Sequence, residues 1–520
     1  MPHETLISIK PREYQQKIFE VCKEKNCLVV LPTGVGKTLI ALMLSIHTQK
    51  EFPSSKTLFL APTKPLAEQH LEYFKKHLPE LFAELTLFTG KTNAEKRKKL
   101  WENSEVIFST PQCIYNDLKN ELYSLENVSL LIQDECHRCL KNYAYTFISE
   151  KYKEQSKNQR ILGLTASPGT DKEKIKQIAI NLGIESIEIR TRDSEDVKEY
   201  LQELEFNTIK LDFPEQFKEI DNLVKSIYEK KVQELKNRKL LFAPPTKTNI
   251  IKLQQQLMSS MNYGSRDFNR LAGVSIAAQA IKISHLIELF ETQTLYTTSN
   301  YIKNIYQQAS KKQSKAVQSI IKNRDFNLAS IKINELISKN LEHPKLLQLV
   351  SIMEESINKN PKNKTIIFSQ FRDTVLKISN ELNKITGIKS KIFVGQMKKA
   401  DTGLSQKEQQ EIMKDFREGK INVICATSIA EEGLDIPEVN SVIFYEPIPS
   451  AIRSIQRRGR TARLMKGKST ILMTIDTLDE IFYYTAISRE KKMYKSIEYV
   501  KEELDKGKGL KIKNKQKTLF

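Results

Sequence analysis

Apolar and polar positions divide the chain into three regions. The first and third contain short apolar runs bounded by polar or turn residues, with helical stretches between them, which is typical of buried parallel strands in α/β domains. The expected strands are 27–31, 57–61, 106–109, 130–132 and 161–164 in the first region, and 365–368, 391–394, 423–426, 441–444 and 470–473 in the third. The pattern therefore predicts an α/β protein with two parallel-sheet lobes.

The middle region is poor in glycine and follows a helical period. Only Gly264 and Gly273 occur between residues 184 and 386, and apolar positions recur at helical spacing over 217–235. We predict a helical domain inserted between the two lobes. The expected divisions are a first lobe at 1–199, a helical insert at 200–340, a second lobe at 341–490 and a basic C-terminal tail at 491–520.

Composition narrows the partners of the chain. It has 520 residues and a net charge of +20, an excess that indicates a polyanionic partner, most often nucleic acid. No apolar run reaches the roughly 18 residues of a membrane span, and the N-terminus shows no secretory pattern. Its six cysteines form no disulfide framework, which indicates reduced thiols. We expect a cytoplasmic, nucleoid-associated protein without a membrane partner.

A glycine-containing loop after the first expected strand carries the strongest chemical signal. Backbone N–H groups at a helix N-terminus bind phosphates, and glycines allow the ligand to approach closely. Lys37 would reach the β- and γ-phosphates, and the Thr38 hydroxyl would ligate Mg²⁺. The predicted nucleotide loop consists of Leu31, Pro32, Thr33, Gly34, Val35, Gly36, Lys37 and Thr38.

A second signal is an acidic pair at the end of an expected strand. Asp134 and Glu135 follow the run 130–132, and the carboxyl ends of parallel strands are where α/β sheets bind ligands. Together with the phosphate loop, Asp134 is a candidate Mg²⁺ ligand and Glu135 a candidate base for the attacking water.

A third signal is an arginine cluster far along the chain. The segment 455–463 reads Ile-Gln-Arg-Arg-Gly-Arg-Thr-Ala-Arg. Clustered arginines repel one another unless an anion lies opposite, so the segment indicates either arginine fingers at a phosphoryl-transfer site or a patch for a nucleic-acid backbone.

These segments belong to a set of motifs that occur in a fixed order: P-T-G-x-G-K-T, A-P-T-K-P-L, T-P-Q, D-E-x-H, L-T-A-S-P, E-E-G-L-D-I-P and Q-R-x-G-R-x-x-R. The set resembles superfamily 2 helicases, which have two RecA-like lobes. Longer stretches at 142–147, 184–192, 403–409 and 444–460 are similar to the helicase part of archaeal Hef and of the Fanconi anaemia group M helicase. The resemblance covers about residues 5–495, and we expect a Hef-like chain without the XPF-like nuclease.

The resemblance implies further roles, position by position. Arg12 and Gln15 would read adenine, and Gly433 and Asp435 would contact the nucleotide from the second lobe. The implied γ-phosphate sensor and fingers are Gln456, Arg460 and Arg463. The implied nucleic-acid contacts are Pro62, Thr63, Lys64, Thr110, Pro111, Gln370 and Thr427, and the implied coupling residues are His137, Thr165 and Ser167.

The resemblance implies an ATP- and Mg²⁺-dependent DNA helicase or translocase, moving 3′ to 5′ on forked or branched DNA in repair or replication-fork processing. Two alternatives stay open. Cys136 in D-E-C-H is shared with Dicer and the RNA sensors, which act on double-stranded RNA, and a non-catalytic scaffold could bind branched DNA without turnover. The end of the chain, 516–520, resembles the start of a sliding-clamp-binding peptide, although a chance match in a basic tail is favoured.

Overall fold

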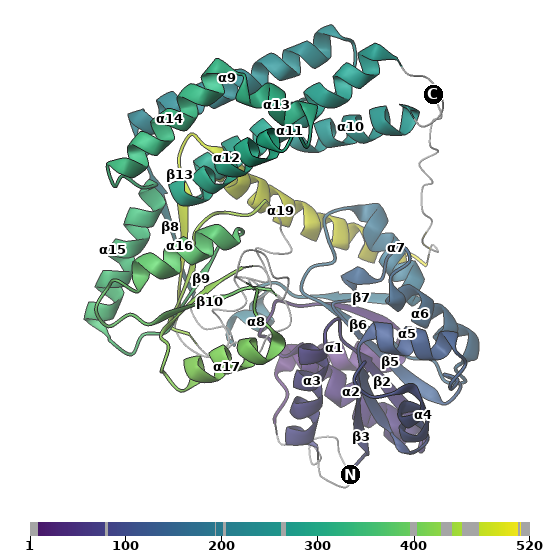
Figure 1. Ribbon diagram of the computed structural model, residues 1–520. Helices are drawn as coiled ribbons and strands as arrows, with labels where there is room; N and C mark the ends of the chain where they lie inside the picture. Colours follow the sequence, from purple (N-terminus) through teal and green to yellow (C-terminus); the bar gives the residue numbers. More distant parts are fainter. Residues whose placement is uncertain are drawn as a thin grey trace.

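The structure is a computed structural model of the chain with two sheet-containing lobes and a helical domain (Figure 1). It describes residues 9–78, 82–192, 194–200, 204–261, 267–395, 403–427, 439–449, 467–507 and 510. In Figure 1 the first lobe lies at the lower right, the second at the left, and the helical domain lies across the top.

The first lobe is built on a seven-stranded sheet of order β3-β4-β2-β5-β6-β1-β7, in which all pairs are parallel. Its strands are β1 (Cys27–Val30), β2 (Lys56–Leu60), β3 (Leu85–Phe88), β4 (Val106–Ser109), β5 (Val128–Asp134), β6 (Ile161–Thr165) and β7 (Ser186–Ile189). The strands expected from the sequence are confirmed. The two that the sequence did not indicate, β3 and β7, are the edge strands, where burial is incomplete and the apolar contrast is weak.

Helices cover both faces of this sheet, and each face has its own apolar core. They are α1 (Glu13–Glu24), α2 (Lys37–Glu51), α3 (Lys64–His77), α4 (Ala94–Asn103), α5 (Pro111–Lys119), α6 (Ala144–Gln155), α7 (Lys172–Leu182) and α8 (Glu195–Lys198). The four buried residues of β1 show why the strand reads as a continuous apolar run: both of its faces are covered.

The second lobe contains a six-stranded parallel sheet of order β10-β11-β9-β12-β13-β8. Its strands are β8 (Leu204–Leu211), β9 (Thr365–Phe368), β10 (Ser390–Phe393), β11 (Val423–Ala426), β12 (Ser441–Phe444) and β13 (Gly467–Thr474). The helices α15 (Pro344–Lys359), α16 (Arg372–Leu382) and α17 (Gln406–Arg417) belong to this lobe. The fold class, two parallel α/β lobes with a helical insert, is thus confirmed.

Strand β8 corrects the expected start of the insert. It pairs with β13 along its whole length, from Leu204 opposite Gly467 to Leu211 opposite Thr474. Residues 204–211 therefore belong to the second sheet, although they precede the insert in the sequence. The boundary expected at residue 200 is too early, because an edge strand joined from a distant part of the chain leaves no local signal.

The insert is a bundle of α9 (Glu215–Asn237), α10 (Lys247–Met261), α11 (Phe268–Thr292), α12 (Leu295–Ser310), α13 (Lys315–Ile321) and α14 (Arg324–Ser338). Among the described residues, α11 alone is long and apolar enough to cross a membrane by length and composition. Its apolar residues form the core of the bundle: Ile283, Leu286 and Phe290 are buried against the inner face of α9. The hydrophobicity of α11 is thus that of a core helix.

The last helix corrects the expected tail. Helix α19 (Leu478–Asp505) includes the first half of the segment expected as a basic tail at 491–520. Met493, Ile497 and Val500 recur at helical spacing and are fully buried in the core of the first lobe. The helical spacing of these apolar residues accounts for the helix, whereas the lysines between them had indicated a tail. The clamp-like segment 516–520 lies outside the described residues.

Candidate active site

The predicted phosphate loop joins the end of β1 to the start of α2. Gly34 and Gly36 have φ of 88° and 80°, a conformation that side chains rarely adopt. A Cβ at Gly36 would lie 2.4 Å from the amide nitrogen of Gln15. Lys37 Nζ donates to the carbonyl of Leu31 over 3.4 Å, and the enclosed Thr33 hydroxyl has no hydrogen-bond partner among the described residues. The loop thus presents glycine backbone, a helix N-terminus and a lysine to an anion.

Gln15 lies against this loop. Its Nε2 is 3.3 Å from the carbonyl oxygens of both Val35 and Gly36, and its Oε1 accepts the N–H of Arg12 at 2.9 Å. The side chain is 2% exposed. Reading adenine through Gln15 would require these bonds to be exchanged, so that role stays a prediction. The guanidinium of Arg12 lies 5.0 Å from the ring centroid of Tyr200.

The predicted magnesium ligands meet through a histidine that the sequence analysis missed. His70, on α3, has Nε2 3.1 Å from Asp134 Oδ2 and Nδ1 3.4 Å from Thr38 Oγ1. A hydroxyl and a carboxylate are oxygen ligands of the kind that Mg²⁺ prefers, so this pair fits the ion. The available signal was that His70 is the polar member of the apolar face of α3, with Ala67 and Phe74.

Glu135 begins a chain of contacts that leads away from the acidic pair. Its Oε2 is 3.2 Å from His137 Nδ1, which lies 3.2 Å from Thr165 Oγ1. Thr165 Oγ1 in turn accepts the N–H of Ser167 at 3.1 Å. The three predicted coupling residues are therefore adjacent.

Electrostatics keep Glu135 ionised. Burial raises the pKa of this carboxyl, but the hydrogen bond from His137 and the positive charge of Lys37 outweigh burial and hold the pKa at about 2. A carboxylate that is ionised at neutral pH can orient a water molecule and accept its proton.

Two helix N-termini lie next to each other at the predicted strand contacts of the first lobe. Thr63 is the N-cap of α3 and Thr110 is the N-cap of α5, and neither side chain caps its helix. These helices follow β2 and β4, which are neighbours in the sheet. The Thr63 hydroxyl is enclosed without a partner among the described residues. Two uncapped helix N-termini are suited to bind successive phosphates.

The remaining predicted contacts of the first lobe flank these caps. Pro62 precedes Thr63, and Pro111 is the first residue of α5. Lys64 forms an ion pair with Glu68 at 3.0 Å.

The second lobe contributes two described candidates. The N–H of Gln370 donates to Glu446 over 2.7 Å, and the N–H of Thr427 donates to the carbonyl of Phe393 over 3.1 Å. Both follow strands of the second sheet, β9 and β11, which are paired. The remaining predicted residues, Gly433, Asp435, Gln456, Arg460 and Arg463, lie outside the described residues.

Family models match most of this architecture. Residues 8–170 match the model "Type III restriction enzyme, res subunit", and residues 345–465 match "Helicase conserved C-terminal domain". Residues 216–338, which cover the insert, match the model "Putative ATP-dependent RNA helicase, helical bundle".

Relatives and a solved structure agree with these matches. A Methanocaldococcus jannaschii protein named "Putative ATP-dependent RNA helicase MJ1505" is 38% identical over 94% of this chain and 60% of its own length. A Neurospora crassa protein named "ATP-dependent DNA helicase mph1" is 31% identical over 89% of this chain and 41% of its own length. The crystal structure of the Pyrococcus furiosus Hef helicase domain is 42% identical, with a TM-score of 0.71, over 92% of this chain and 98% of that one. The chain thus spans less than two thirds of these two relatives and nearly all of the solved domain.

Proposed function

Because the chain belongs to the Hef-like family of superfamily 2 helicases, we propose that it is an ATP-dependent DNA helicase or translocase that acts on forked or branched DNA. The observation that carries the proposal is one shared edge of the first sheet. The phosphate loop, the acidic pair and the two uncapped helix N-termini all follow the carboxyl ends of its strands.

ATP would bind at the phosphate loop, with its phosphates on the backbone N–H groups at the start of α2 and on Lys37. Thr38 and Asp134 would hold Mg²⁺, which neutralises charge on the β- and γ-phosphates when bound. Lys37 leaves the Leu31 carbonyl to reach the phosphate, and Glu135 orients the attacking water and accepts its proton.

DNA would bind through its phosphates on both lobes, at the residues that follow the carboxyl ends of the strands. Thr63 and Thr110 offer unused hydroxyls and helix N-termini on the first lobe, while Gln370 and Thr427 lie at corresponding positions on the second. Such contacts follow the backbone and not the bases, so they suit a protein that steps along a strand of any sequence. We propose 3′-to-5′ movement, as the family resemblance implies.

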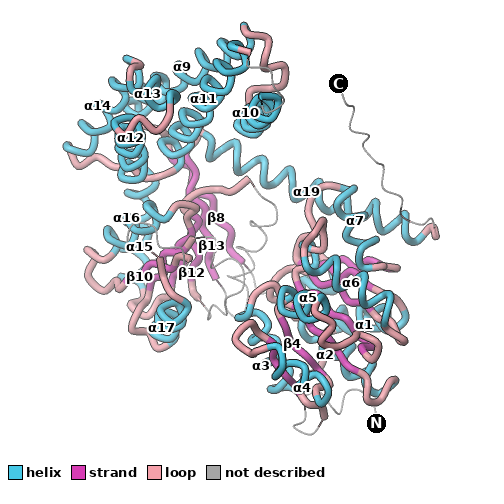
Figure 2. The backbone as a smooth tube through the Cα atoms, turned by 45° about the vertical axis from the view of Figure 1, so that its right-hand side comes forward, coloured by secondary structure: helices cyan, strands magenta, loops and turns pink. Residues whose placement is uncertain are grey.

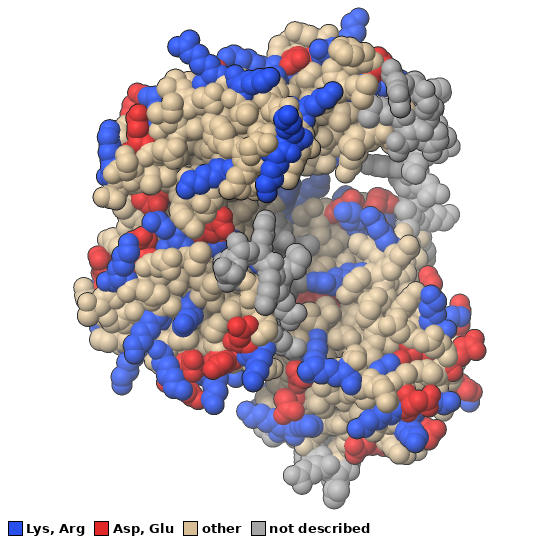
Figure 3. Space-filling view, viewed as in Figure 1, with Lys and Arg blue, Asp and Glu red and all other residues tan. Residues whose placement is uncertain are grey.

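The insert would provide the preference for branches. Six exposed cations lie on α12, on α13, at the start of α14 or in the turns between these helices, and none of them pairs with a carboxylate in the described part of the chain: Lys303, Lys311, Lys312, Lys315, Lys322 and Arg324. Figure 3 shows Lys and Arg side chains along the insert and around the hollow between the insert and the first lobe. A duplex that enters beside the tracked strand would meet this positive surface.

The rate of ATP hydrolysis with different nucleic acids tests the proposal. We expect hydrolysis to rise with single-stranded DNA and to rise further, or at lower concentration, with forked DNA. A chain that binds forks but hydrolyses no ATP under any condition would instead be a branched-DNA scaffold.

Double-stranded RNA is the second candidate substrate. Cys136 in the acidic motif favours double-stranded RNA. The M. jannaschii relative is named an RNA helicase, while the N. crassa relative is named a DNA helicase. The same assay with an RNA duplex separates the two. Stimulation by RNA that exceeds stimulation by forked DNA would replace our proposal with the RNA-dependent one.

A further inference from the structure

Helix α19 has its two ends in different parts of the molecule. Asp479, in its first turn, is fully buried beside the insert and the second lobe. Met493, beyond the middle of the helix, is fully buried in the core of the first lobe. Between them Ile481, Tyr484 and Ile487 are 59%, 52% and 37% exposed. Figure 2 shows α19 running from the second sheet to α7 of the first lobe. The middle of α19 is thus exposed along one side, while on the second lobe the Tyr483 hydroxyl lies 3.3 Å from the Thr208 hydroxyl and Arg489 donates to the carbonyl of Pro449.

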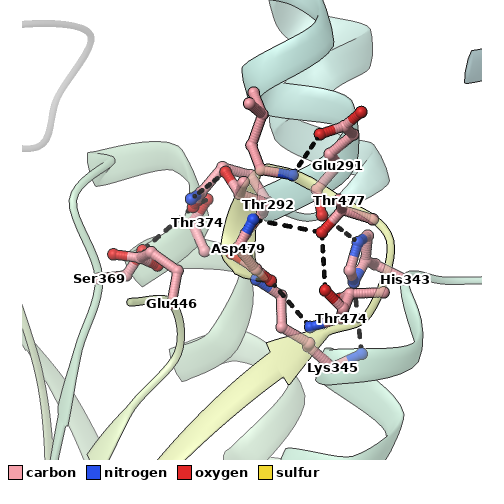
Figure 4. Close-up of polar contacts among 12 residues, drawn as sticks. Glu291, Thr292, His343, Lys345, Ser369, Thr374, Glu446, Thr474, Thr477 and Asp479 are labelled. Carbon is pink, nitrogen blue, oxygen red and sulfur yellow. Dashed lines mark hydrogen bonds and ion pairs between the residues drawn. The ribbon is translucent and has the colours of Figure 1, made fainter. Parts of the chain in front are cut away.

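The N-terminal anchor is a buried polar junction (Figure 4). Asp479 Oδ2 accepts from Lys345 Nζ at 2.6 Å, and neither side chain is exposed. Lys345 Nζ also donates to the carbonyl of Thr292 at 2.7 Å, and the N–H of Leu478 donates to Glu291 at 2.6 Å. Because Thr292 and Glu291 end α11 while Lys345 begins α15, these bonds fix the start of α19 to the insert and the second lobe together.

The same end of α11 reaches the predicted nucleic-acid contact of the second lobe. Gln293 Oε1 accepts from Thr374 at 2.8 Å and lies 3.2 Å from the Ser369 hydroxyl. Ser369 also donates to Glu446, the carboxylate that accepts the N–H of Gln370. The insert, the Gln370 loop and the first turn of α19 therefore share one hydrogen-bonded network, most of which Figure 4 draws.

The C-terminal anchor lies on the coupling motif of the ATP site. The hydroxyl of Ser167 donates to Met493 Sδ over 2.8 Å, and the hydroxyl of Ser496 donates to the carbonyl of Thr170 over 3.1 Å. Ser167 is the last member of the contact chain that starts at Glu135 and passes through His137 and Thr165.

Peripheral contacts strengthen this second anchor. Lys176 pairs with Glu503 at 2.7 Å, and the ammonium of Lys172 lies 3.7 Å from the ring centroid of Tyr499.

From these two anchors we infer that α19 is a connecting rod that transmits movement between the Glu135 to Ser167 chain of the first lobe and the insert with the Gln370 loop. An intact helix is stiff along its length, so a shift of the Ser167 loop displaces the junction at Asp479, and a load on the insert acts back on the ATP site. Met493 is a positioning residue in this scheme, because it acts through Ser167. The inference rests on the proposed ATP-driven function.

Lowering the stiffness of the middle of α19 tests the inference that this helix transmits movement. One variant carries Gly at each position of Ile487–Lys491, and its matched control carries Ala at the same positions, so both lose the same side chains and charges. Glycine lowers the helix propensity of this exposed segment without changing its length. We expect both variants to hydrolyse ATP at the basal rate of the parent. The Gly variant should lose roughly five- to a hundredfold of the stimulation by DNA, the range of a typical coupling, while the Ala variant keeps it.

A distance measurement decides the question without DNA. The cysteines of the described chain are all buried, so fluorophores on S259C in α10 and K119C in α5 report the separation of insert and first lobe. A non-hydrolysable ATP analogue should change this separation in the parent and the Ala variant, and the change should be lost in the Gly variant. Equal changes of this separation in the Gly and Ala variants would refute the inference that α19 transmits movement.

Should the Gly variant fail to fold, a milder change loosens the second anchor. Tyr499→Ala with Glu503→Gln removes the two peripheral contacts with α7 and should reduce stimulation in the same direction. Stimulation of ATP hydrolysis by DNA equal to that of the parent would contradict the inference that α19 transmits movement. A parent that DNA does not stimulate would instead refute the proposed function, and the distance measurement would still test α19.

Discussion

At the scale of single residues, Glu135 and Lys37 lie close to each other but act differently. Lys37 would ligate phosphate, while Glu135 would act on water, and its ionised state depends on His137 and Lys37. The sequence indicates both as candidates, because the loop and the acidic pair each follow an apolar run. His70 could not be identified in this way, since its contacts to Thr38 and Asp134 join positions 32 and 64 residues apart.

Two substitutions separate these roles. Lys37→Ala removes a phosphate ligand and should abolish turnover and weaken ATP binding. Glu135→Gln keeps the shape of the side chain but not the base, so ATP should still bind while turnover falls by roughly 10²–10⁴-fold, the usual contribution of a general base. Nucleotide-binding titrations and ATPase rates on both variants measure the difference. Turnover by Glu135→Gln near the parent rate would refute the role of Glu135.

His70 should stabilise the nucleotide-free protein. His70→Ala leaves the buried Asp134 carboxylate without this partner, which should cost about 1–3 kcal/mol of unfolding free energy. Chemical denaturation measures the loss. His77→Ala, near the end of the same helix and only partly buried, should cost less than about 1 kcal/mol. Equal losses would mean that the contacts of His70 add nothing beyond its place on α3.

Glu291 should make stability depend on pH. Burial, with the nearby charge of Asp221, raises the pKa of this carboxyl to about 7 although Lys225 opposes the shift. The folded protein therefore keeps a proton that the unfolded chain releases, so the contribution of Glu291 to stability falls as pH rises from about 4.5 to about 7. Glu291→Gln can still accept the N–H of Leu478 but does not ionise. In denaturation experiments across this range, the unfolding free energy of the variant should increase relative to that of the parent as pH rises. A difference in unfolding free energy that does not change with pH would contradict the raised pKa.

At the scale of elements, the sequence predicted the interior strands well and the boundaries poorly. Interior parallel strands such as β1 and β5 are buried on both faces and read as continuous apolar runs. Strand β8 and helix α19 depend on partners more than 200 residues away, β13 for the one and the core of the first lobe for the other. No local pattern could show that 204–211 completes the second sheet or that 491–505 docks on the first lobe.

The basic face of the insert should control binding to forks. Replacing Lys303, Lys311, Lys312, Lys315, Lys322 and Arg324 by Gln should flatten the dependence of log K on log salt by roughly 0.9 for each duplex phosphate that the variant no longer neutralises. Single-stranded DNA, which we expect the lobes to hold, should lose less affinity. Equilibrium binding of both substrates over a salt series tests this.

Lobe 1 offers a matched control for that series. Six exposed lysines on or beside α3 and α4 can be replaced in the same way: Lys75, Lys76, Lys91, Lys96, Lys98 and Lys99. This variant has the same net charge as the insert variant. Equal losses of affinity for the two variants would show that total charge matters and that the insert has no particular role.

At the scale of the whole molecule, the chain has a first lobe that carries the candidate ATP site, a second lobe, an insert fixed to the second lobe, and a helix that reaches back to the first lobe. The buried ion pair of Lys345 and Asp479 joins α15 to α19, and the bonds from Lys345 to Thr292 and from Leu478 to Glu291 attach the insert to the same junction, so we treat the insert and the second lobe as one unit. Relative movement is therefore expected between this unit and the first lobe, which is the movement that a stepping motor requires.

The most direct test of the central claim is the ATP-driven release of streptavidin from biotinylated single-stranded DNA. A protein that moves 3′ to 5′ displaces streptavidin from a 5′ biotin and leaves a 3′ biotin occupied. We predict release from the 5′ end by the parent and none by Glu135→Gln, which should bind DNA and ATP without moving. Release by both proteins, or no release from either end by a parent that hydrolyses ATP with DNA, would contradict translocation driven by this site.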